Sequence, residues 1–120
     1  MIMYKFEKLE VWELAMKFNA LSYDIADKLP DSEKYNLTSQ LKRASTSIAL
    51  NIAEGSTGQS NAEQSRFLSF AIRSHVEVVA CIRLIQERDY LDSNNDLINR
   101  FEKLGSLLFA KLNAFKSAIR

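Results

Sequence analysis

Apolar residues recur at steps of three and four along four long segments of the chain. In the first segment the stripe consists of Val11, Leu14, Phe18, Leu21 and Ile25. This spacing follows the turn of an α-helix and gives the helix one apolar face. The pattern predicts four amphipathic helices of similar length, at about residues 7–28, 34–54, 61–88 and 94–119.

Short polar breaks separate these segments. The only proline, Pro30, lies in the first break, and two of the three glycines lie in the second, at Gly55 and Gly58. Two candidate N-terminal caps precede the third and fourth segments: Ser60 with Glu63, and Ser93 with Asp96. Four similar helices with short connections pack as an up-down antiparallel four-helix bundle, so the predicted fold is all-α.

The third segment carries a second apolar face beside its main stripe. This face consists of Leu68, Ile72, His75, Val76 and Val79. On the fourth segment, Ile98 and Phe109 lie to one side of the main stripe in the same way. Two interpretations stay open. Either the third helix is buried on two sides within the bundle, or these residues form an interface between copies of the chain.

The composition fits one compact domain over residues 1–120. Hydrophobic residues make up 47% of the chain, with 3 glycines and 1 proline, which disfavours both disorder and a sheet protein rich in turns. The net charge of +1 predicts no strong overall attraction to nucleic acid or to membranes. One cysteine allows no internal disulfide, and no apolar run of signal-peptide or membrane-spanning length is present. We therefore expect a soluble cytoplasmic protein.

Four local strings match a known family of helical proteins. The most specific string is NIAEG at residues 51–55, in step with Gln40 and Arg43 upstream. The others lie within residues 6–12, 29–37 and 63–77. Over about residues 6–91 the sequence resembles the 23S rRNA intervening sequence family. It departs from the family at Asn36, where glycine is common, and at Leu50, where proline or alanine is usual.

The resemblance implies a bacterial four-helix bundle that assembles with itself, often as a ring of five subunits. Some members are encoded inside insertions in ribosomal RNA genes. The accessory protein of diversity-generating retroelements is a relative that binds nucleic acid and a reverse transcriptase. For most members the function is unknown, and the family supplies no catalytic residues.

Five polar or small residues of the matched strings are candidates for a site. They are Gln40, Arg43, Asn51, Glu54 and Gly55. The first four form two pairs three residues apart, so each pair shares a helix face. They form either a polar site at one end of the bundle or, as we favour, structural hydrogen bonds between helices or subunits. We expect Gly55 to end the second helix in the left-handed conformation that favours glycine.

The residues that most often perform catalysis or bind metals are scarce. His75 is the only histidine, and the residue three positions before it is Ile72 rather than the glutamate of a di-metal bundle. Cys81 lies in an apolar stripe with no base beside it in the sequence, so we expect a packed thiol rather than a nucleophile. We predict no enzyme activity, no metal and no cofactor.

The charge is uneven, because residues 94–120 hold five basic and two acidic side chains, a net charge of +3. Arg100, Lys103 and Lys111 fall on one side of the predicted fourth helix. Such a strip is often only a solvated face. Repeated around a symmetric oligomer, however, it would form a band able to hold phosphate backbones.

Two functions therefore stay open. The first is a homo-oligomeric bundle that acts as an accessory module binding RNA or DNA, with the strip as its contact. The second is a scaffold that binds only a protein partner, through the second apolar face. Neither function involves catalysis.

Overall fold

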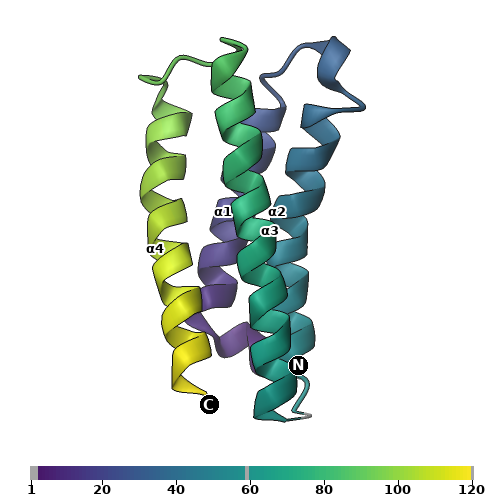
Figure 1. Cartoon of the computed structure of the whole chain (residues 1–120), viewed down its shortest axis with the longest axis vertical. Helices are drawn as coiled ribbons and strands as arrows, with labels where there is room; N and C mark the ends of the chain where they lie inside the picture. Colours follow the sequence, from purple (N-terminus) through teal and green to yellow (C-terminus); the bar gives the residue numbers. More distant parts are fainter. Residues whose placement is uncertain (1–2, 59, 120) are drawn as a thin grey trace.

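The computed structural model describes residues 3–58 and 60–119. Four helices stand side by side and alternate in direction, which confirms the predicted all-α up-down bundle (Figure 1). The described residues contain no strand. The helices are α1 (Glu10–Ala26), α2 (Leu37–Gly55), α3 (Asn61–Glu87) and α4 (Asp96–Ala118). Two short 3-10 helices, η1 (Lys5–Lys8) and η2 (Asp31–Glu33), precede α1 and α2.

The four helices form a closed square in cross-section. The neighbouring pairs are α1 with α2, α2 with α3, α3 with α4, and α4 with α1. The bundle measures 44 × 25 × 24 Å. Each helix therefore has two neighbours, and each pair of neighbours forms one outer face of the molecule.

The first two helices begin three residues later than the periodicity predicts. Residues 5–8 form the 3-10 helix η1, and the extended backbone of Leu9 then separates it from α1. In the same way, Asn36 has a non-helical backbone between η2 and α2. Apolar periodicity cannot distinguish these short 3-10 turns from the first turn of an α-helix, because both present side chains at similar spacing.

One of the two predicted caps is present. The Ser60 hydroxyl accepts a hydrogen bond from the backbone N–H of Glu63 at 3.0 Å, as predicted. The prediction for the fourth helix is wrong, because Asn95 is the cap and its side-chain oxygen accepts from the N–H of Leu97 at 2.8 Å. Both residue types supply a short side-chain acceptor to the free N–H groups of a first turn.

Gly55 is the last residue of α2, but the reason predicted for it is wrong. The described glycine with a positive φ is Gly58, at 89°, and not Gly55. A Cβ atom on Gly55 would lie 2.8 Å from the Cβ of Phe67 on α3. Glycine is therefore required at this position for the close approach of two helices.

The core runs the length of the bundle and draws on all four helices. Its largest fully buried side chains include Phe18, Leu41, Ile48, Ile82 and Phe101. On α3 the buried face lies between the two predicted apolar faces. It consists of Leu68, Ala71, His75, Val78, Cys81, Ile82 and Ile85. The main apolar stripe predicted for this helix consists of Phe67, Ala71, Ser74, Val78, Cys81 and Ile85. The buried face is displaced from it by a fraction of a turn, because Phe67 and Ser74 are only half-buried.

Candidate functional site

The predicted basic strip on α4 is divided in the structure. Arg100 and Lys103 are exposed on the face shared with α1, and Lys103 has no ion-pair partner within residues 3–58 and 60–119. Arg100 pairs with Asp96 one turn earlier on α4, at 3.6 Å. Lys111 lies in a separate hollow further along α4 and pairs with Glu10 at 3.3 Å. Arg100 and Lys103 thus belong together, and Lys111 does not join them.

A groove between α1 and α4 is lined by a set of basic side chains that differs from the predicted strip. This α1–α4 groove has a volume of about 550 Å³. It is lined by Lys17, Ala20, Leu21, Asp24, Arg100, Lys103, Leu104 and Leu107. Three cationic side chains and one carboxylate give these lining residues a net formal charge of +2. Lys17 was not predicted, because it lies on a different helix and sequence periodicity relates only residues of the same helix.

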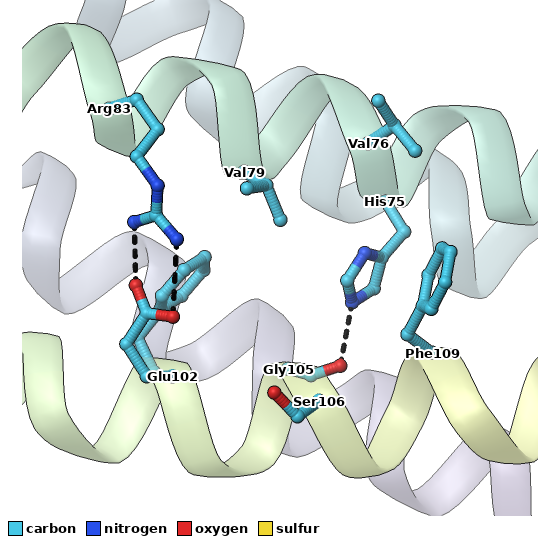
Figure 2. A pocket seen from close by; sticks show the side chains of 9 residues that line it. His75, Val76, Val79, Arg83, Glu102, Gly105, Ser106 and Phe109 are labelled. Carbon is cyan, nitrogen blue, oxygen red and sulfur yellow. Dashed lines mark hydrogen bonds and ion pairs between the residues drawn. The ribbon is translucent and has the colours of Figure 1, made fainter.

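A second groove lies on the neighbouring face, between α3 and α4. This α3–α4 groove has a volume of about 290 Å³. Its lining residues are His75, Val76, Val79, Arg83, Phe101, Glu102, Gly105, Ser106 and Phe109. Figure 2 shows the two polar links that cross it from α3 to α4. Arg83 donates to both carboxylate oxygens of Glu102, at 2.6 and 3.2 Å, and His75 bonds to the backbone of Gly105.

The residues predicted for a subunit interface divide into two groups. Leu68, His75 and Ile98 are buried within the chain itself, so they offer no surface to a partner. This part of the second apolar face therefore fits the interpretation of deep burial. The other four residues remain accessible: Ile72 and Val79 are half-buried, Val76 is 53% exposed and Phe109 is 39% exposed. Three of these four, all except Ile72, line the α3–α4 groove.

His75 forms the floor of the α3–α4 groove in an apolar environment. Its ring stacks on Phe18, with ring centres 5.0 Å apart, and Phe109 covers it at 5.1 Å. The Nε2 atom lies 2.9 Å from the carbonyl oxygen of Gly105. A carbonyl can only accept, so Nε2 carries a proton and donates it to this hydrogen bond. Nδ1 is buried with no hydrogen-bond partner among the described residues.

Burial lowers the pKa of His75 below its ordinary value of 6.5, and the hydrogen bond to Gly105 opposes this effect. A proton on Nδ1 would add a buried charge and an N–H donor without an acceptor. The charged side chains that line the same groove, Arg83 and Glu102, are already paired with each other. The neutral form of His75 is therefore the form that the fold requires.

Acidification through the pKa range of histidine should destabilise the protein through His75. The unfolded chain takes up a proton near pH 6.5 and the folded chain resists it, so stability falls as the pH drops below that value. Urea denaturation at about pH 7.5 and pH 5.5 should show this loss in the native protein, and a smaller loss in His75→Gln, whose amide can still donate to Gly105. An equal loss in both proteins would assign the pH dependence to other groups.

A buried carboxylate gives a separate pH effect in a lower range. Glu33 accepts hydrogen bonds from the Tyr90 hydroxyl at 2.7 Å and from Asn36 at 3.0 Å, and so ties two connections together at one end of the bundle. The bond from Tyr90 lowers the pKa of Glu33 below its ordinary value of 4.5. Glu33 therefore loses its stabilising effect only as the pH falls below 4.5, outside the range of the His75 experiment.

Among the polar residues of the matched strings, Arg43 bonds to another helix, while Asn51 and Gln40 bond to residues of α2 and its N-cap. Arg43 forms an ion pair with Glu77 and thereby links α2 to α3. Asn51 donates to the Ser47 carbonyl at 2.9 Å and to its hydroxyl at 3.0 Å. Gln40 bonds to Asn36 at 2.9 Å. Arg43, Asn51 and Glu54 also line a hollow of about 460 Å³ along α2, which Tyr23 of α1 borders and Gln40 does not reach.

The thiol of Cys81 is expected to be unreactive. Cys81 is buried, and burial raises the pKa of its thiol, with the nearby carboxylate of Glu77 adding to the effect. A protonated thiol is a weak nucleophile. Within the part of the chain that the structure describes, no three His, Cys, Asp or Glu side chains gather closely enough to hold a metal ion.

Comparison with known proteins gives a family match and no curated relative. A search of curated proteins finds no match to the chain. None of the helices in the described ranges combines the length and apolar character that crossing a membrane requires. Residues 7–110 match the family described as 23S rRNA-intervening sequence protein, which covers most of the bundle. The chain therefore belongs to the 23S rRNA-intervening sequence protein family.

Proposed function

We propose that this protein is a non-enzymatic, cytoplasmic accessory module that assembles with itself and binds RNA or DNA through the α1–α4 groove. The observation that carries the proposal is the convergence of Lys17, Arg100 and Lys103, from two helices, on one groove of a nearly neutral chain. Phosphates attract such a cluster without any reading of base sequence. The family description, which refers to intervening sequences of 23S rRNA, is in keeping with a nucleic-acid partner.

Self-assembly strengthens this function. One groove with a net formal charge of +2 holds few phosphates, and each phosphate contact contributes modestly at physiological salt. A symmetric oligomer repeats the groove and lets one strand contact several copies, which raises the effective concentration of the later contacts. The assembly that we propose has five subunits, as the resemblance to the family implies.

The α3–α4 groove is the face that we assign to this assembly. It is lined mainly by apolar side chains, and Val76 and Phe109 leave it partly exposed. Exposed apolar surface of this kind marks interaction sites. The groove also lies on a different face from the α1–α4 groove, so a partner that covers it would leave the basic side chains free for nucleic acid.

Lys103→Glu is the most direct test of the basic cluster. Lys103 is exposed and lies outside the ion pairs of the described residues, so the change should leave the fold intact. It should weaken binding to every nucleic-acid sequence to a similar degree and reduce the salt slope of the affinity by about 1 for each subunit that the strand contacts. Fluorescence anisotropy over a series of salt concentrations measures both effects.

Lys34→Glu is the matched control for that experiment. It makes the same change of charge at an exposed site in the connection between α1 and α2. If both variants weaken binding equally, the effect is one of net charge and the α1–α4 groove is not the site. If neither weakens it, nucleic acid binds elsewhere.

A scaffold that binds only protein is the second candidate function. The apolar lining of the α3–α4 groove is the observation in its favour, because the same surface would accept a helix of another protein. Size exclusion with light scattering and the ratio of absorbance at the nucleic-acid and protein maxima distinguishes the candidates. A closed oligomer that loses nucleic acid at high salt supports the first, and a monomer free of nucleic acid supports the second.

A further inference from the structure

The α1–α4 groove has an apolar floor as well as a basic rim. Each helix contributes residues at positions i, i+3, i+4 and i+7, which form one continuous helix face. The apolar positions are Ala20 and Leu21 on α1, with Leu104 and Leu107 on α4. Leu107 is 46% exposed, so part of this floor remains in contact with solvent.

We propose that the groove selects single-stranded over duplex nucleic acid, with an unpaired base on the Leu104–Leu107 floor and its flanking phosphates on Lys17, Arg100 and Lys103. This inference rests on the proposed function and adds the class of nucleic acid to it. The volume of about 550 Å³ lies between the two helices, where the apolar and cationic side chains share one concave surface.

The apolar floor is the feature that would make the groove prefer single-stranded over duplex nucleic acid. In a duplex the faces of the bases are stacked inside, and only base edges, sugars and phosphates reach a protein. A duplex could use the basic rim, but it would leave Leu104 and Leu107 without an apolar partner. In a single strand the bases can turn outward and lay an apolar face on the protein.

The charges on the rim are available to phosphates. Lys17 pairs with Glu13, and Arg100 with Asp96, each at 3.6 Å and between exposed side chains on the same helix. Such exposed pairs are weak, so a phosphate can take the place of the carboxylate. At Lys103 a phosphate has no carboxylate to displace, since this side chain has no ion pair in the described residues.

The single carboxylate of the groove fits the same arrangement. Asp24 lies among the lining residues and would repel a phosphate placed beside it. A carboxylate can, however, accept a hydrogen bond from the amino group of a base, as it does from cytosine. Asp24 thus favours a base at its part of the groove, with the phosphates nearer to the cations.

The test compares two fluorescent probes of equal length, an oligodeoxycytidylate and a mixed-sequence duplex, on the native protein and on Leu107→Ser. We expect the native protein to bind the single strand more tightly. Leu107→Ser should weaken single-strand binding several-fold and leave duplex binding unchanged. Leu107→Tyr supplies an aromatic face at the same exposed position and should strengthen single-strand binding roughly fivefold.

Leu84→Ser is the control, because Leu84 is 53% exposed on α3 and lies outside the α1–α4 groove. It should bind both probes like the native protein. Equal affinity for the two probes, or an equal loss of both in Leu107→Ser, would overturn this inference while the proposed function stands. Binding of neither probe, prepared both as DNA and as RNA, would overturn both and direct the search to an acidic, amphipathic protein helix as the occupant of the groove.

Discussion

Phe18→Ala should reduce the free energy of unfolding by about 3–5 kcal/mol, as expected for a large side chain removed from a closed core. Phe18 is fully buried and stacks on Phe101, at 4.9 Å between ring centres, and on His75 on the opposite helix. It also lies against Gly105, where an added Cβ would come within 3.0 Å of its ring. Alanine would leave a cavity where three helices meet.

Urea denaturation at one fixed protein concentration measures this loss, since the stability of an assembled protein depends on concentration. Met16→Ala is the control from the same helix. Met16 is 47% exposed, so its loss should change stability by only about 0.5 kcal/mol. A loss below about 1 kcal/mol in Phe18→Ala would mean that α1 and α4 close over the gap, and that the aromatic cluster is not what fixes their spacing.

Val76→Glu should convert the proposed oligomer into a folded monomer. In the single chain Val76 is 53% exposed, so a glutamate at this position remains hydrated and the bundle keeps its stability. In an assembly that covers the α3–α4 groove, the same carboxylate would be buried without a partner, at a cost of several kcal/mol. Light scattering on the eluting peak should show a mass near the 13.7 kDa of one chain.

Leu84→Glu is the matched control for Val76→Glu. Leu84 lies on the same helix with the same exposure of 53%, but it does not line the α3–α4 groove. It should keep the native mass and the native helix content by circular dichroism. If both variants dissociate, a broader part of α3 is covered. If Val76→Glu remains assembled, the subunits meet on another face.

The helices could be predicted because the sequence signals that specify a helix lie within the helix itself or next to it. A periodic apolar stripe and the Ser60 hydroxyl act within one helix, and both are visible in the sequence. The two 3-10 turns before α1 and α2 were missed, since their side-chain spacing differs little from that of an α-helix.

The sites were predictable only in part, because they depend on which helices become neighbours. Lys17 joins Arg100 and Lys103 from another helix, while Glu10 of α1 pairs with Lys111. Neither relation leaves a periodic trace in the sequence. We predicted that Gly55 is needed for the backbone conformation at a helix end. It is needed instead because a larger residue would collide with Phe67 on the next helix. Such pairings follow from tertiary packing, to which a single sequence gives little access.

The two grooves share α4, and consecutive residues of this helix point into different ones. Glu102 lines the α3–α4 groove and Lys103 the α1–α4 groove, and the same alternation recurs at Ser106 and Leu107. A small rotation of α4 about its own axis would therefore reshape both grooves at once. Whatever occupies one groove and prefers one orientation of α4 would alter the affinity of the other, and thermodynamic linkage makes that influence equal in both directions.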